Sequence, residues 1–217
     1  MCIRNIYRRI VFITAAYIAV TFVVFSLLIL KIHASTNTSL NTPTSYSNTG
    51  IPGGMVMSAD GAGLWYVDVQ NQRVVELNST TGNIIRTVGR SGSAVGEFYT
   101  AFSITRDSEG FLYVLAQENS LLYKLDPNGG FMQTYQLVNN NSEGLSIPFG
   151  ITFDAYSNSF LVTDWNLGHI EKYDRSFNLV SEFGTNGHSS APGDLFNPAG
   201  IRTDNLGNIG LISKTGV

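Results

Sequence analysis

The stretch that decides the fold is residues 148–198, which reads PFGITFDAYSNSFLVTDWNLGHIEKYDRSFNLVSEFGTNGHSSAPGDLFNP. It contains four short apolar runs, at 148–154, 159–164, 169–174 and 179–184, and each run ends in Asp or Gly. Short apolar runs that are separated by turn residues are typical of β-strands joined by tight turns. The stretch therefore predicts a four-stranded antiparallel meander.

Copies of this unit recur along the chain. Gly54, Ser103, Gly150 and Gly200 occupy equivalent positions that are 49, 47 and 50 residues apart. A fixed period in this range is typical of solenoids and propellers. The predicted units are residues 51–99, 100–147, 148–197 and a partial unit at 198–217.

The pattern Pro-x-Gly-Ile-x-x-Asp at 148–154, together with Asp68-Val-Gln-Asn-Gln-Arg73, resembles the NHL repeat. The resemblance covers about residues 50–217. The resemblance is specific in the first and third units and degenerate in the second. There Ala116 stands at the position of Asp68, and Leu121 stands at the position of Arg73. The resemblance implies an all-β fold, an NHL-type β-propeller of four-stranded antiparallel blades.

Three and a half blades are fewer than the four to eight of a closed propeller ring. An open arc would expose an apolar face at each end, at a cost on the order of 10 kcal/mol. We therefore expect this sequence to be a truncated propeller. Self-association of partial rings is the alternative, if the chain truly ends at Val217.

Residues 10–30 carry no charge. A helix of this length spans about 31 Å, which matches the hydrocarbon core of a bilayer. We predict one transmembrane signal anchor at 10–32 that contacts the membrane through 10–30. The arginines of the short basic tail, 1–9, outnumber Lys31, which predicts a cytoplasmic N-terminus and an extracellular propeller. A cleaved signal peptide and a secreted protein are the alternative.

Residues 33–50 are rich in Ser, Thr and Asn and predict a stalk without a core of its own. Asn37, Asn78 and Asn140 each begin an N-glycosylation triplet, as expected for a glycoprotein outside the cytoplasm. The single cysteine, Cys2, excludes an internal disulfide, so packing alone must hold the β-region together.

Charge argues against one class of partner. Residues 32–217 hold nine basic and sixteen acidic side chains, which gives a net charge of −7. Nucleic-acid binding requires basic clusters that neutralise phosphates. We therefore expect no nucleic-acid partner, and RNA binding is the least favoured function.

Catalytic and metal-binding patterns are weak in this sequence. His33, His169 and His188 lack metal-ligand spacing, so neither a metal site nor a catalytic residue is predicted. The aspartates at turns and strand ends recur in successive units, which favours a structural role in turns. A ring of these carboxylates that binds a cation such as calcium is the alternative; otherwise no cofactor is expected.

Aromatic residues near strand ends are the better candidates for partner contacts. Trp165 follows the strand-end Asp164, and Tyr99 and Phe149 lie near strand ends or in innermost strands. A repeated scaffold without a non-repeated catalytic cluster favours a non-catalytic interaction module that binds protein, peptide or glycan through its inter-strand loops. The alternative is an enzyme, a propeller of the peptide-amidating lyase or lactone-hydrolase kind.

Overall fold

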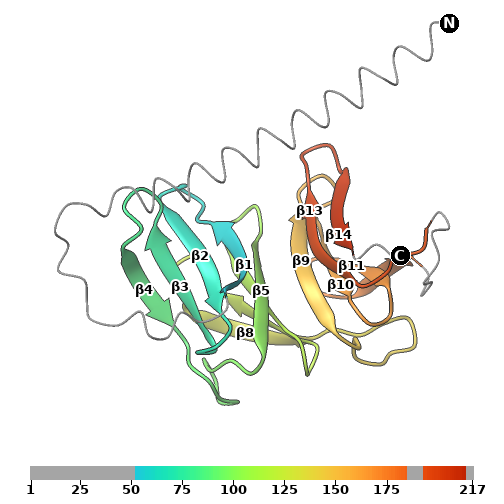
Figure 1. Ribbon diagram of the computed structural model, residues 1–217, viewed down its shortest axis with the longest axis horizontal. Coiled ribbons are helices and arrows are strands. Elements are labelled where there is room, and N and C mark those ends of the chain that lie inside the picture. Colours follow the sequence, from blue (N-terminus) through green and yellow to red (C-terminus); the bar gives the residue numbers. More distant parts are fainter. Residues whose placement is uncertain (1–51, 185–192, 214–217) are drawn as a thin grey trace, which may run out of the picture. The chain divides into compact units, whose positions relative to one another are not determined.

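The computed structural model of this chain describes residues 52–184 and 193–213 (Figure 1). The predicted tail, anchor and stalk, with Asn37, lie outside the described residues. Within the described ranges, no helix has the length and apolar character needed to cross a bilayer.

Within these ranges the chain forms fourteen strands in four antiparallel sheets. The first sheet contains β1 (Pro52–Met57), β2 (Gly63–Asp68), β3 (Arg73–Asn78) and β4 (Ile84–Val88). The second contains β5 (Ala101–Arg106), β6 (Leu112–Ala116), β7 (Leu121–Leu125) and β8 (Phe131–Gln136). The third contains β9 (Pro148–Asp154), β10 (Ser159–Asp164), β11 (His169–Tyr173) and β12 (Leu179–Phe183), and the fourth contains β13 (Pro198–Thr203) and β14 (Ile209–Ser213).

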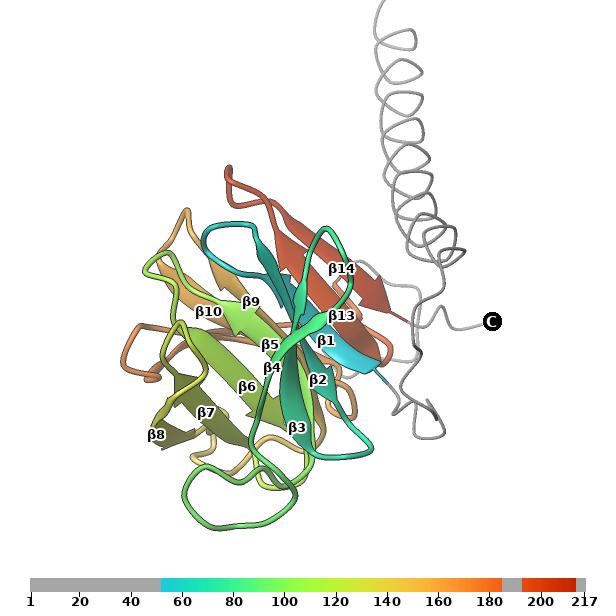
Figure 2. The same ribbon diagram turned by 90° about the vertical axis from the view of Figure 1, so that its left-hand side faces the viewer.

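Each sheet is a meander in which consecutive strands pair. The first strands of successive sheets, β1, β5, β9 and β13, contact one another in that order. We call these four the inner strands, because the remaining strands of each sheet follow them in order, as Figure 1 shows for β1 to β4 and Figure 2 for β5 to β8. This is the arrangement of propeller blades, so each sheet is called a blade below, and the two-stranded fourth sheet is a half blade.

Aspartates set the turns that follow the inner strands. The Asp204 carboxylate accepts hydrogen bonds from the backbone N–H groups of Leu206 and Asn208, at 2.8 and 2.9 Å. Gly207 completes this turn with a φ of +83°, in the left-handed region that favours glycine. Short polar side chains that bond to their own turn favour such turns, which explains why Asp recurs after each inner strand except β1.

Glycines let the inner strands approach one another closely. A β-carbon at Gly54 would lie 2.7 Å from the backbone nitrogen of Ile104 in β5. A β-carbon at Gly150 would lie 2.2 Å from the carbonyl oxygen of Ala199 in β13. Residues with side chains at these two positions would force the inner strands apart.

The hydrophobic cores lie between blades, because both faces of the strands carry apolar residues. Trp65 of the first blade packs in one cluster with Ile104 and Leu112 of the second. Tyr113 of the second blade packs in another cluster with Phe160 and Tyr173 of the third. All six of these residues are at least 99% buried. Blade-to-blade packing therefore supplies the stability that no disulfide provides.

Candidate functional site

The antiparallel order of the strands gathers several connections at one end of the blades. At this end each inner strand begins, the second strand ends and the third begins; in the first blade Pro52 pairs with Asp68, which pairs with Arg73. We call it the connection end. It comprises the blade-to-blade connections 89–100 and 137–147 and the turns 69–72, 117–120 and 165–168.

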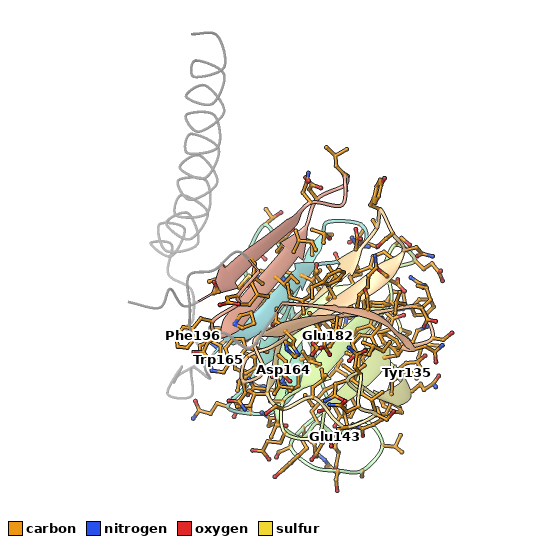
Figure 3. All side chains as sticks on the ribbon, turned by 90° about the vertical axis from the view of Figure 1, so that its right-hand side faces the viewer. Tyr135, Glu143, Asp164, Trp165, Glu182 and Phe196 are labelled. Carbon is orange, nitrogen blue, oxygen red and sulfur yellow. The ribbon has the colours of Figure 1, made fainter. Side chains whose placement is uncertain are left out.

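Three aromatic rings form a row at the connection end. Phe149, at the start of β9, stacks on Trp165 with ring centroids 5.0 Å apart and an interplanar angle of 27°. Its other neighbour is Phe102 of β5, at 4.4 Å and 60°. All three residues are half-buried, so the row also presents surface to solvent. We call these three residues the aromatic row; Figure 3 labels Trp165.

Trp165 is held on both sides by backbone contacts. Its N–H donates to the carbonyl oxygen of Ile147 at 2.9 Å, and its own carbonyl oxygen accepts from Asn197 Nδ2 at 3.0 Å. The turn that carries it thus bonds to the connection before the blade and to the one after it. These contacts fix the backbone that carries Trp165, and stacking on Phe149 orients its ring before any ligand arrives.

Tyr99, the third predicted contact residue, lies in the 89–100 connection and is 45% exposed. Its hydroxyl donates to the Glu118 carboxylate, and this hydrogen bond together with the negative charge raises the pKa of Tyr99. Within the described ranges Tyr99 makes no ring contact with the aromatic row. The structure therefore brings together Phe149 and Trp165 and keeps Tyr99 separate.

A cavity of about 250 Å³ adjoins the aromatic row. Residues of all four inner strands line it, among them Gly54, Phe102, Phe149 and Arg202. The Arg202 guanidinium donates to the carbonyl oxygen of Met55 at 3.2 Å and links β13 to β1. The cavity therefore combines glycine backbone, aromatic faces and one cation.

The strand-end aspartates are engaged in hydrogen bonds. The fully buried Asp164 carboxylate accepts four backbone N–H groups, those of Ser146, Ile147, Asn166 and Leu167. In this way it joins the 137–147 connection to the 165–168 turn. Four N–H donors satisfy the carboxylate without a cation.

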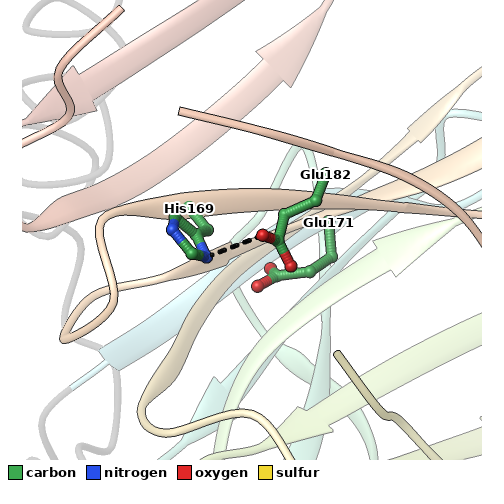
Figure 4. A group of neighbouring side chains, drawn as sticks. All are labelled: His169, Glu171 and Glu182. Carbon is green, nitrogen blue, oxygen red and sulfur yellow. Dashed lines mark ion pairs between the residues drawn. The ribbon is translucent and has the colours of Figure 1, made fainter. Parts of the chain in front are cut away.

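A second group of polar side chains lies on the third blade, beside the 165–168 turn (Figure 4). His169 and Glu171 are two residues apart on β11 and share one face. Glu182 of the neighbouring strand β12 pairs directly with Glu171. His169 Nδ1 lies 3.2 Å from Glu182 Oε1, and ligand atoms of the three residues lie within 4.8 Å of one another. We call these three residues the His169 group.

Burial strongly perturbs Glu171. Its side chain is fully buried, and among the described residues neither carboxylate oxygen has a hydrogen-bond partner. Burial, followed by the negative charges of Asp164 and Glu182, raises the pKa of Glu171 to about 8. An unpaired carboxylate in this position is costly to the fold unless a proton or a cation neutralises it.

The sequence pattern alone does not single out Glu171 or Glu182, and His169 has no metal-ligand spacing to another histidine. The sequence feature that could have revealed this group is a residue type in the third unit that differs from those at the equivalent positions of the first and second units. Glu171 occupies the position of Val75 in β3 and Tyr123 in β7, which are both buried. A buried carboxylate where the other blades carry apolar or aromatic groups marks a non-repeated feature. The other two histidines, His33 and His188, lie outside the described residues.

The predicted glycosylation sites differ in their surroundings. Asn140 is exposed in the 137–147 connection. Asn78 ends β3, and its side-chain oxygen accepts from the N–H groups of Thr80 and Thr81 at 3.0 and 2.8 Å. A glycan at Asn140 would extend into solvent without disturbing a turn.

No protein-family model matches this chain, and no curated protein sequence matches it. Solved structures resemble it. A protein of unknown function from Bacteroides thetaiotaomicron has a TM-score of 0.60 and 20% identity, over 77% of this chain and 46% of its own. A catalytically inactive virginiamycin B lyase from Staphylococcus aureus with quinupristin has a TM-score of 0.50 and 18% identity, over 75% and 47%. The RRP9 WD40 repeats have a TM-score of 0.51 and 10% identity, over 69% and 41%.

The four-stranded antiparallel blades and these neighbours define the class: the chain has a β-propeller fold. It spans somewhat less than half the length of these three solved chains. The neighbours include both a lyase and WD40 repeats, so the shared scaffold is compatible with catalysis and with binding.

Proposed function

We propose that this chain is an NHL-type propeller that acts as a non-catalytic interaction module and binds a peptide segment of a partner protein at the connection end. The observation that carries the proposal is the aromatic row beside the glycine-lined cavity. Buried aromatic anchors that sit in pockets dominate the energetics of protein interfaces.

The size of the cavity favours a side chain over a whole small molecule. Its volume of about 250 Å³ lies below the ~300–1,000 Å³ that is usual for small-molecule sites. A single large side chain of a partner fits such a volume. The half-buried rings of Phe102 and Phe149, which line the cavity, would then contact the inserted side chain, while Trp165 stacks on Phe149 at the rim.

A selection of displayed peptides on the full-length chain would test this proposal. Trp165→Ala should weaken the selected peptides at least about tenfold, since interface hot spots are worth ~2 kcal/mol or more. The matched control is Tyr156→Ala, because Tyr156 is 72% exposed in the turn at the opposite end of the same blade. The circular dichroism of both variants should match that of the parent chain.

Two outcomes would refute the peptide proposal. Selected peptides could bind Trp165→Ala and Tyr156→Ala equally well, which would place their site away from the aromatic row. Alternatively, a glycan array could give a Trp165-dependent signal while no peptide is selected, which would assign the row to sugar rings.

We further propose that the propeller lies outside the cell and that the segment 10–32 anchors it with the N-terminus in the cytoplasm. The uncharged segment and the excess of arginine before it support this orientation. Glycosidase treatment of the cellular protein should increase its mobility, and Asn140→Gln should remove one step of that shift. Protein that needs no detergent for release from membranes would support the secreted alternative.

The enzyme alternative rests on the His169 group, because a buried, non-repeated carboxylate is also a mark of functional chemistry. An enzyme of the lyase or lactone-hydrolase kind would show metal-dependent turnover that survives purification. If that turnover is absent in His169→Ala and present in Tyr156→Ala, the protein is an enzyme and the non-catalytic proposal is wrong.

A further inference from the structure

The His169 group has no part in the proposed peptide binding, because its residues make no contribution to the aromatic row. Its three side chains meet because of strand geometry. Positions two apart on β11 place His169 and Glu171 on one face, and direct pairing places Glu182 on that same face. Ligand atoms that lie within 4.8 Å of one another need only small side-chain rotations to reach a common ion at about 2.0–2.2 Å from each.

The unpartnered carboxylate of Glu171 is the independent sign of a ligand. It is fully buried and faces the other two donors, and its oxygens accept no hydrogen bond from the described residues (Figure 4). Buried polar groups in native proteins nearly always have a partner. A cation between Glu171 and Glu182 would supply that partner and offset their mutual repulsion.

The neighbouring side chains that the structure describes do not neutralise these two carboxylates. Asp164 supplies no positive charge, and its carboxylate already accepts four backbone N–H groups. Lys172 projects from the opposite face of β11, and Arg175 is bonded to Asp107 and Glu109. In the described part of the chain no Lys or Arg forms an ion pair with Glu171 or Glu182.

We propose that His169, Glu171 and Glu182 bind one Zn²⁺ ion on the third blade. An imidazole nitrogen with two carboxylates is a donor set suited to zinc, whereas Ca²⁺ and Mg²⁺ prefer oxygen ligands alone. Three protein ligands leave a coordination position for water or for a group of a bound partner. The His169 and Glu182 side chains are 21% and 17% exposed, so the ion has a route from solvent.

The site would also stiffen the connection end. His169 directly follows the 165–168 turn, and Glu182 belongs to the adjacent outer strand. A shared ion would therefore hold β11 to β12 next to the turn that carries Trp165. This proposal stands apart from peptide binding, and either can fail without the other.

The test uses the full-length chain, purified in detergent with an affinity tag that contains no histidine and then stripped with a chelator. Isothermal titration with ZnCl₂ should give one site that depends on the His169 group. Glu171→Gln and His169→Ala should each weaken this binding at least about tenfold, because even residues outside the ligand shell cost 10–100-fold. Glu143→Gln is the matched control, since Glu143 is an exposed carboxylate of the 137–147 connection.

Circular dichroism separates loss of the site from loss of the fold, and Glu171→Gln is the more informative variant because it removes a buried charge while conserving shape. Cys2 and His33 remain in every variant, so zinc bound there persists in His169→Ala and is recognised as background. The proposal is overturned if the folded parent chain binds no zinc, if both variants bind it like the parent, or if CaCl₂ binds the same site as tightly.

Discussion

Replacing Gly150 with alanine tests whether the inner strands β9 and β13 can lie close together only because position 150 has no side chain. A β-carbon at Gly150 would lie 2.2 Å from the Ala199 carbonyl oxygen, whereas real β-carbons essentially never approach within 3.0 Å. The two strands β9 and β13 must therefore separate by about 0.8 Å, the difference between these distances. The oxygen belongs to the backbone, so no side-chain rotation relieves the clash.

This separation also breaks a bridge between the third blade and the half blade. The Gly150 N–H donates to Thr163 Oγ1 at 2.8 Å, and that hydroxyl donates to the Ala199 oxygen at 2.8 Å. Lengthening the second contact by the same amount brings it to about 3.6 Å, which is no longer a hydrogen bond. Overpacking costs ~1–3 kcal/mol and a buried unsatisfied group another ~1–3, so we expect a loss of about 2–6 kcal/mol.

Urea unfolding of the full-length chain, followed by tryptophan fluorescence, would measure this loss, because Trp65 is fully buried. With a slope of about 1–3 kcal/mol per molar urea, the midpoint for Gly150→Ala should fall by about 0.7 M or more. Gly210→Ala is the matched control, since Gly210 lies in β14 and the nearest atom to its added β-carbon is 3.8 Å away. The control should be neutral or stabilised by up to ~1 kcal/mol. Equal midpoints for the two variants would refute the close-approach argument.

Two further predictions concern buried carboxylates. Arg175→Met removes the cation 2.9 Å from the buried Asp107 and should cost ~2–4 kcal/mol in urea unfolding. Glu109, the other carboxylate that pairs with Arg175, is 63% exposed, so Glu109→Ala should cost under ~0.5 kcal/mol. Similar losses for the two variants would contradict the role given to burial. In metal-free protein, the Glu171 pKa of about 8 exceeds its ordinary 4.5, so the folded chain holds a proton that the unfolded chain releases between these values. Stability should therefore fall as pH rises from 4.5 to 8, by up to ~1.4 kcal/mol per unit. Glu171→Gln should flatten this slope in a urea series with chelator, and an unchanged slope would show that other groups cause it.

The sequence was sufficient to predict the β-propeller architecture, because the residues that determine it either act within one turn or repeat once in each blade. The equivalent glycines, among them Gly54 and Gly150, mark inner strands that touch, and the aspartates bond within their own turns. Both signals are local or periodic, and repetition makes them visible in one sequence. The transmembrane anchor and the stalk stay predictions, since they fall outside the described residues.

The candidate site was predictable only in part. Trp165 and Phe149 could be chosen from their places at strand ends, and the structure stacks them. Phe102 belongs to the same row, but its contact with Phe149 crosses from one blade to the next. Such a contact depends on how blades pack, and strand patterns within one blade carry no information about it.

The His169 group was hidden for a different reason, a one-residue irregularity in strand pairing. Tyr173 pairs with Leu179, so a regular hairpin would place Ser181 opposite Glu171 and turn Glu182 to the other face. Instead Lys172 pairs with Ser181 and Glu171 with Glu182, because a bulge intervenes between Lys172 and Tyr173. The first and second blades have the same bulge, between Glu76 and Leu77 and between Lys124 and Leu125. The bulge thus belongs to the scaffold, and only in the third blade does it bring two carboxylates and an imidazole together; the repeat supplies the geometry, and the departure from the repeat supplies the chemistry.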